Sequence, residues 1–224
     1  DAILVNTAPR TSTPENHELL IQQAQGGMPM VELFGRNLIS VPSIVSDCHA
    51  AGYQATLKLV TSGLKRVASW SPHPFEDASQ PTPRTWFALE MYRGYQQAMQ
   101  EAGLPHDLAC FEPTGPNAAP GTGLTQQAKQ LLSDRPGLQG LVTPAEIAAN
   151  AVSQTLLDTP TLAGPGFTQA SFRTGEKPMG LRDRRVAIRI RAQEIGAAAA
   201  RMAFQQIRGQ RPDDQALAPD IDDD

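Results

Sequence analysis

The sequence predicts an α/β protein in two lobes, each with a mainly parallel sheet flanked by helices. Short apolar runs that suit strands alternate with helical segments, and the connections between them are short, as in parallel sheets with crossover helices. The 224 residues suffice for two lobes of about 100 residues each. Hydrophobic residues make up 40% and charged residues 19% of the chain, as is typical of a folded globular protein.

The first third of the chain predicts four strands and two helices. The first helix stops at the pair Gly26-Gly27, and the second takes Asp47 as its N-cap and ends at Gly63. The strands are apolar runs that end at turn-forming residues. The predicted elements are strand 1–6, helix 15–25, strand 28–34, strand 43–47, helix 48–63 and strand 65–70.

A proline-rich stretch, residues 71–85, interrupts this pattern and predicts a long loop, because proline continues neither a helix nor a sheet. The alternation then resumes. In 186–209 a short strand runs into an alanine-rich helix, whose small side chains suit close packing on a sheet. The other predicted elements are helix 85–103, strand 108–113, helix 125–133, strand 140–144, helix 145–157, strand 161–166 and a last short strand within 216–221.

Three segments resemble, in the right order, the effector-binding domain of the lactose-repressor/galactose-repressor (LacI/GalR) family of bacterial transcription regulators. They are "LKLVTSGLKRVASW" after Asp47, "MYRGYQQAMQEAGL" at 91–104 and "EIGAAAARMAFQQIRG" at 194–209. The resemblance covers essentially the whole chain. It implies the two-lobed fold of periplasmic sugar-binding proteins, in which the chain crosses three times between lobes.

The resemblance also implies how the chain is divided. The first lobe would comprise 1–66 plus 190–212, and the second lobe 67–189 plus 213–224. The family's helix-turn-helix headpiece and its first two strand-helix units would precede Asp1 and are not in this sequence. We therefore expect the first lobe to be incomplete, with an exposed sheet edge and exposed apolar helix faces.

Several positions depart from the family's ligand contacts. Met91 stands where many members have an effector-binding arginine, three residues before the helix glycine Gly94. Pro144-Ala145 replaces an Asn-Asp pair, and Pro165-Gly166-Phe167 is matched with Gly-Phe-Asp. The carboxylate and amide groups that usually form hydrogen bonds with sugar hydroxyls are therefore missing from these second-lobe positions.

Candidate ligand contacts come from the ends of predicted strands and from the proline-rich loop, because ligands of such sheets bind at the carboxyl ends of the strands. Aromatic rings that bracket the loop could stack on a sugar ring; the alternative is that the tryptophans fill the core. Asp47-Cys48-His49 reads as a cap followed by ordinary helix residues. The predicted contacts are Asn6, Asp47, Trp70, Phe75, Trp86, Thr143 and Phe167.

The sequence does not indicate a catalytic site, a cofactor or a metal site. No nucleophile, base and orienting group can be assembled from it, and it contains no Walker-type loop, Gly-x-Ser-x-Gly or His-Glu-x-x-His. His73 near Glu76 and Asp77 has no second histidine at a ligand spacing. Cys48 and Cys110 are expected to be reduced. We predict no catalytic residues, no metal and no cofactor.

The net charge of −4 lacks the positive field that attracts nucleic acid, and no run of residues predicts a membrane span. The first hypothesis is therefore the effector-binding and dimerisation domain of a LacI-type regulator, which senses a small polar molecule such as a sugar in an interlobe cleft. It implies a cytoplasmic homodimer that reaches DNA only through the missing headpiece. The alternatives are a solute-binding protein of a transport system with the same fold and an α/β enzyme.

Overall fold

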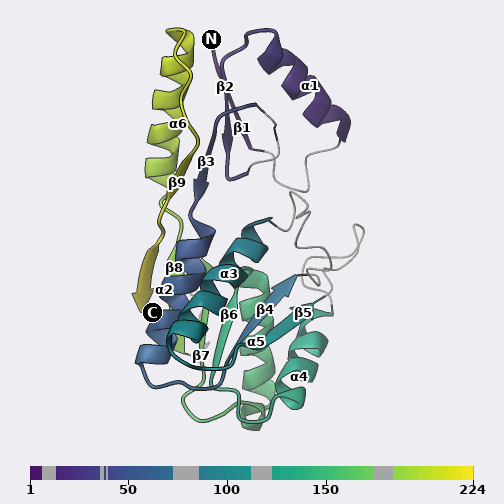
Figure 1. The fold of residues 1–224 in the computed structure, drawn as a ribbon. Coiled ribbons are helices and arrows are strands. Elements are labelled where there is room, and N and C mark those ends of the chain that lie inside the picture. Colours follow the sequence, from purple (N-terminus) through teal and green to yellow (C-terminus); the bar gives the residue numbers. More distant parts are fainter. Residues whose placement is uncertain are drawn as a thin grey trace. The chain divides into compact units, whose positions relative to one another are not determined.

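A computed structural model describes residues 1–6, 14–35, 38, 40–72, 86–111, 123–173 and 184–223. Contacts divide the described chain into two compact units, each with its own sheet (Figure 1). Unit 1 holds the described parts of Asp1–Asp47 together with Arg191–Ala218. Unit 2 holds the described residues between 48 and 190, together with 219–223. The α/β class with parallel sheets is confirmed.

Unit 1 is built on a four-stranded sheet in the order β1-β2-β3-β9, in which every neighbouring pair is parallel. Helices α1 and α6 lie on opposite sides of this sheet (Figure 1). Leu20, Ile21 and Ala24 of α1 pack against the core around Met30. The elements are β1 (Ile3–Asn6), α1 (Pro14–Gln25), β2 (Met30–Leu33), β3 (Ser43–Ser46), α6 (Ala192–Ile207) and β9 (Gln215–Leu217).

The alanine-rich helix α6 packs on β2 and β3 as its composition predicts. Its buried face consists of Ile195, Ala198, Ala199, Met202 and Ala203. Ala192, the first residue of the helix, is exposed. Small side chains at these positions let the helix axis approach the sheet closely.

Unit 2 is built on a six-stranded sheet in the order β10-β8-β7-β6-β4-β5, and only the β10–β8 pair is antiparallel. One core lies between the sheet and helices α2 and α3, and a second core includes side chains of α4 and α5. The helices are α2 (Cys48–Thr61), α3 (Trp86–Glu101), α4 (Leu124–Asp134) and α5 (Glu146–Asp158). The strands are β4 (Val67–Pro72), β5 (Leu108–Phe111), β6 (Gly140–Thr143), β7 (Thr168–Arg173), β8 (Arg184–Arg189) and β10 (Asp220–Asp223).

Two glycines bring helices α2 and α3 of unit 2 into backbone contact. A Cβ at Gly52 would lie 1.9 Å from the carbonyl oxygen of Met91. A Cβ at Gly94 would lie 2.1 Å from the carbonyl oxygen of His49 and 2.6 Å from the backbone nitrogen of Tyr53. Gly94 is the glycine of the "MYRG" motif, and this crossing is the physical reason that no larger residue fits there.

The prediction of a strand at 161–166 is wrong. Pro160–Leu162 forms a short 3-10 helix, and Gly166 at φ 74° turns the chain into β7. No strand was predicted at Thr168–Arg173, where the structure has β7. In the structure Gln169 and Ser171 are buried in the middle of the sheet, with exposed fractions of 0% and 4%.

The structure also divides the chain elsewhere than the sequence suggested. The expected first boundary lay after residue 66, whereas unit 2 begins at Cys48, because α2 packs on α3 and the sheet of unit 2. The expected second-lobe segment 213–224 is itself divided. Strand β9 pairs with β3 in unit 1, and β10 pairs with β8 in unit 2.

Candidate functional site

The carboxyl ends of parallel strands are where sheets of this class bind ligands. In unit 1 this edge carries two of the predicted contacts. Asn6 ends β1 with an exposed side chain. Asp47 follows β3, directly precedes α2, and donates its backbone N–H to the carbonyl oxygen of Leu217 at 2.7 Å. Both residues therefore stand at the expected edge.

Phe34 follows β2 at the same edge, and the sequence reasoning missed it. Its φ of 58° lies in the left-handed region, which is uncommon for an aromatic residue. Its N–H donates to the carbonyl oxygen of Ile44 at 3.0 Å, and its exposed fraction is 42%. An aromatic ring held in this way at a ligand-binding edge is a candidate stacking surface. The sequence feature that could have identified Phe34 is its place as the aromatic residue at the end of the apolar run "MVELF".

Glu32 is a fully buried carboxylate in β2, two residues before Phe34. Its Oε2 accepts a hydrogen bond from the backbone N–H of Leu38 at 2.9 Å. Burying a polar group costs free energy unless it is hydrogen-bonded. Glu32 thereby connects the backbone of Leu38 to strand β2.

In unit 2 two hydroxyl side chains lie next to each other at the carboxyl edge. Thr143 ends β6 and is paired in register with Ser171 of β7. Both are buried, and the Thr143 hydroxyl accepts a long hydrogen bond of 3.5 Å from the N–H of Ala145. Thr143 was a predicted contact, whereas Ser171 was missed because β7 was missed.

The aromatic residues predicted as ligand contacts lie in different environments. Trp70 is 1% exposed and meets Phe111 edge-on at a centroid distance of 4.9 Å, so it fills the core, which was the alternative. Trp86 is the first residue of α3 and is half-buried against the core that includes Cys48. Phe75 lies outside the described residues.

Phe167 lies at the opposite edge from the one predicted. It precedes β7, so it stands at the amino end of the sheet, with an exposed fraction of 8%. With Ser153, Leu156, Leu157, Pro160, Ala163 and Gly164 it lines a small pocket there. The assignment of Phe167 as a contact at the carboxyl edge was wrong, because it relied on the strand at 161–166.

Arg173 is the residue that ends β7 at the carboxyl edge. The strand to compare with the family's Gly-Phe-Asp is therefore β7, which ends in Ser171-Phe172-Arg173. Arg173 is half-buried, and it is paired in register with Arg189, the last residue of β8. Arg189 forms an ion pair of 2.6 Å, through its Nε, with Asp222 of β10. The edge thus carries a cation where the resemblance implied a carboxylate.

Met91 does not replace the family's effector-binding arginine in function. Its exposed fraction is 1%, and it belongs to the core beneath α2 and α3. The neighbouring Arg93 is exposed and pairs with Glu90 on the same helix at 2.6 Å.

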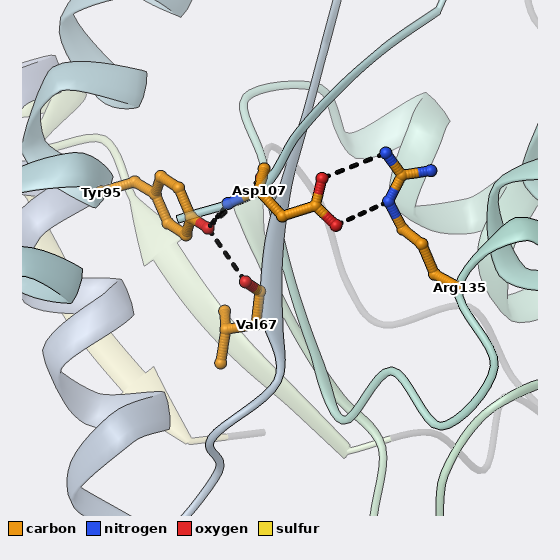
Figure 2. A network of polar contacts seen from close by, with 4 residues as sticks. All are labelled: Val67, Tyr95, Asp107 and Arg135. Carbon is orange, nitrogen blue, oxygen red and sulfur yellow. Dashed lines mark hydrogen bonds and ion pairs between the residues drawn. The ribbon is translucent and has the colours of Figure 1, made fainter. Parts of the chain in front are cut away.

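A polar network organises the amino edge of unit 2 (Figure 2). The hydroxyl of Tyr95 donates to the carbonyl oxygen of Val67 at 2.9 Å and accepts from the N–H of Asp107 at 2.8 Å. Arg135 holds the Asp107 carboxylate with two hydrogen bonds, of 2.7 and 3.1 Å. Burial raises the pKa of Tyr95 far above its ordinary value of 10.0. The network joins α3, β4, the start of β5 and the end of α4, and its role is structural.

Each of the two α/β units has polar groups at the carboxyl edge of a parallel sheet, the edge at which sheets of this class bind ligands. The chain belongs to the family described as periplasmic binding proteins and sugar binding domain of LacI family, whose model matches residues 4–218. The family description names binding proteins and a sugar-binding domain, the three solved structures described below are transcription regulators or a repressor, and none of these descriptions names an enzyme. No curated protein sequence matches the chain.

Solved structures share the fold at low sequence identity. The Cra transcriptional dual regulator from Pseudomonas putida, in complex with fructose 1-phosphate, is 18% identical with a TM-score of 0.73, over 100% of this chain and 77% of that one. A putative ribose operon repressor from Burkholderia thailandensis is 18% identical with a TM-score of 0.69, over 99% and 76%. A LacI family regulator from Enterococcus faecium with bound ribose is 15% identical with a TM-score of 0.72, over 99% and 77%.

Proposed function

We propose that the chain is the effector-binding and dimerisation domain of a LacI-type transcription regulator and that it senses a small polar molecule. The observation that carries the proposal is the set of polar side chains at the carboxyl edge of each sheet. In unit 1 these are Asn6 and Asp47, and in unit 2 Thr143 and Ser171. Such an effector acts by stabilising one arrangement of the protein, for which it has the higher affinity.

The ligand contacts proposed from the sequence are revised accordingly. Trp70 and Phe167 leave the set, since one is in the core and the other is at the amino edge. Phe34 joins it, because its exposed ring at the end of β2 offers a stacking surface. The proposed set is Asn6, Phe34, Asp47, Phe75, Trp86, Thr143 and Ser171.

Sugars are the effector class that the family supports best. The Enterococcus faecium regulator holds ribose, and the Pseudomonas putida regulator holds fructose 1-phosphate. A ligand that binds only the folded state raises the melting temperature. A thermal-shift screen against sugars, sugar phosphates, polyols and nucleosides is therefore the first test. A saturable rise with one class supports the proposal, and a folded chain that responds to none of them contradicts it.

Phe34 gives the site a sharper test by isothermal titration with the ligand that the screen finds. Phe34→Ala should weaken binding about tenfold, since an aromatic face buried against a sugar is worth about 1.5 kcal/mol. Phe204→Ala is the matched control, because Phe204 is also an exposed phenylalanine, on α6, with an exposed fraction of 64%. Equal affinities for the two variants would remove Phe34 from the site.

DNA binding, a homodimer and a cytoplasmic location go with the regulator proposal, and DNA would be reached through a headpiece outside this sequence. Among the described helices none combines the length and the apolar character that a bilayer crossing needs. The second candidate is a solute-binding protein of a transport system, because the family description includes periplasmic binding proteins. A helix-turn-helix encoded upstream of Asp1 would decide for the regulator, and a secretion signal there for the second candidate.

A further inference from the structure

A groove crosses the amino edge of the sheet of unit 1, opposite the edge at which the effector contacts of this unit are proposed. Strands β2, β3 and β9 begin at the amino edge, and helices α1 and α6 end there (Figure 1). Two cavities of about 420 and 280 Å³ make up the groove, and the lining that they share is Ser40, Pro42, Arg211 and Pro212. The larger cavity falls within the range of roughly 300–1,000 Å³ that is typical of small-molecule sites.

Hydrogen bonds between distant segments fix the polar floor of the groove. Ser43, at the start of β3, is 2% exposed and lines the larger cavity. Its N–H and its hydroxyl both donate to Oδ1 of Asp214, at 2.7 and 3.2 Å. In the smaller cavity the Gln206 side chain accepts from the N–H of Met30 at 2.9 Å and donates to the Met30 carbonyl oxygen at 2.7 Å. These contacts hold the strand starts and the end of α6 together, so the floor is preformed.

One wall of the groove, residues 211–214, carries charges of both signs. Arg211 lines both cavities, whereas Asp213 and Asp214 line the larger one only. Within the described part of the chain, the side chains of Arg211 and Asp213 form no hydrogen bond and no ion pair. Asp214 binds Ser43 through Oδ1 alone, so its Oδ2 is also available. A guanidinium and carboxylate oxygens therefore line one cavity without being paired to each other.

The opposite wall contributes a hydroxyl group on an unusual backbone. Ser40 lines both cavities, and its φ of 72° lies in the left-handed region that favours glycine. It sits in a turn in which the N–H of Val41 donates to the carbonyl oxygen of Leu38 at 3.3 Å. Glycine would adopt this conformation without strain, but it would offer no hydroxyl to the groove. Strained residues of this kind cluster at binding sites.

We propose that this groove is a second ligand site and that it binds a small zwitterion, an amino acid or a short peptide. Arg211 binds the carboxylate, since a guanidinium can give it two parallel hydrogen bonds. Asp213 and Oδ2 of Asp214 accept hydrogen bonds from the ammonium group. An ion of one sign would meet a like charge on the same wall, whereas a molecule with both charges avoids that repulsion. The inference goes beyond the proposed function, because it concerns the other edge of the sheet.

Calorimetry on the whole chain tests the ligand class. The probes are alanine, 4-aminobutyrate and dialanine, whose ammonium and carboxylate groups are separated by different lengths of chain. Each is compared with its N-acetylated and its amidated form, which carry one charge only. We expect one zwitterion to bind with a Kd below about 1 mM and both of its one-charge forms to bind about tenfold more weakly or worse. The affinity should fall as salt is raised, because these charged contacts are open to solvent.

Variants locate the binding. Arg211→Gln and Asp213→Asn should each weaken binding of that zwitterion by about tenfold or more, and neither removes a contact within the described chain. Arg201→Gln, at an exposed position of α6, is the matched control and should bind as the parent chain does. Phe34→Ala, at the other edge of the sheet, should also leave this affinity unchanged. The circular dichroism spectrum and melting curve of each variant show whether it is folded.

The outcomes separate this inference from the proposed function. If no probe binds the folded chain more tightly than about 1 mM, the inference fails and the effector-binding function stands. The same holds if a one-charge form binds as tightly as its zwitterion, or if Arg211→Gln binds as the parent does. If Phe34→Ala abolishes binding and Arg211→Gln does not, the probe occupies the proposed effector site, which overturns the inference and supports the proposed function.

Discussion

The Tyr95 hydroxyl is the residue-scale feature with the clearest energetic consequence. It is a buried polar atom that serves two backbone groups, the carbonyl of Val67 and the N–H of Asp107 (Figure 2). Replacing Tyr95 with phenylalanine removes both hydrogen bonds and leaves two polar groups without that partner. We expect Tyr95→Phe to lower the free energy of unfolding by about 1–3 kcal/mol, measured by urea denaturation.

Tyr53→Phe is the matched control for that prediction. The Tyr53 hydroxyl also forms a hydrogen bond, to Glu101 at 2.7 Å, but this pair is at the surface, where water replaces the lost partner. The free energy of unfolding should change by less than about 0.5 kcal/mol. Similar losses in both variants would show that the buried network contributes no more than a surface contact.

Tyr95 also predicts a dependence on alkaline pH. Burial raises its pKa in the folded state above the ordinary value of 10.0, so the folded protein keeps this proton when the unfolded chain loses it. The folded state then binds more protons, and stability should fall as pH rises above about 10. Denaturation of the parent and of Tyr95→Phe from pH 9 to 11 checks this. The variant should show a shallower decline, and parallel curves would contradict the assignment.

At the scale of elements, the sequence predicted most strands and helices, but not the strand that matters for the site. Its alternation of apolar strands and helices identified β6 and α6 because their burial follows from their composition. Strand β7 was missed because Gln169, Ser171 and Arg173 are polar, although the sheet buries the first two. Whether a polar residue belongs to a central strand depends on the strands that pair with it. The periodicity of the sequence carries no information about those partners. Ser171 was absent from the predicted site for that reason.

The crossing of α2 and α3 gives the element-scale prediction. In Gly94→Ala the new Cβ would overlap the backbone of α2 at His49, and backbone atoms cannot rotate away as a side chain can. The helices must separate, and we expect a loss of about 1–3 kcal/mol or more in the free energy of unfolding. Chemical denaturation measures it.

Gly196→Ala is the control for the helix crossing and should have the opposite sign. Gly196 is an exposed position inside α6, and a Cβ there meets no atom within 4 Å. Alanine should raise the free energy of unfolding by about 0.5–1 kcal/mol, because it is the better helix former. A loss in both variants would mean that helix geometry, and not the contact between α2 and α3, decides the effect.

At the scale of the whole molecule, separate sheets and separate cores predict separate unfolding. Unit 1 and unit 2 each have a core of their own, so calorimetry should resolve two transitions, or one transition with a van't Hoff enthalpy below the calorimetric enthalpy. Gly94→Ala should lower only one of them. A single two-state transition that Gly94→Ala shifts as a whole would show that the units unfold together.

The sequence anticipated two lobes but divided them at other residues. Its first boundary followed the end of α2, because a helix that follows β3 without a break looks like part of the same lobe. The contacts of Gly52 with Met91 assign α2 to unit 2 instead. The sequence also placed 213–224 in a single lobe, whereas β9 belongs to unit 1. Strand β9 is only three residues long, and its composition does not indicate that it pairs with β3.

The short segment from Gln215 to Asp223 supplies an edge strand to each sheet, with the change of unit at Ala218 and Pro219. Any protease cut, frameshift or fusion that disturbs these few residues therefore disturbs two sheets at once. Mutations in this region should look like global folding defects, although they lie far along the chain from most of either core. In a genetic screen for loss of function, variants in this segment would be recovered as low-abundance proteins.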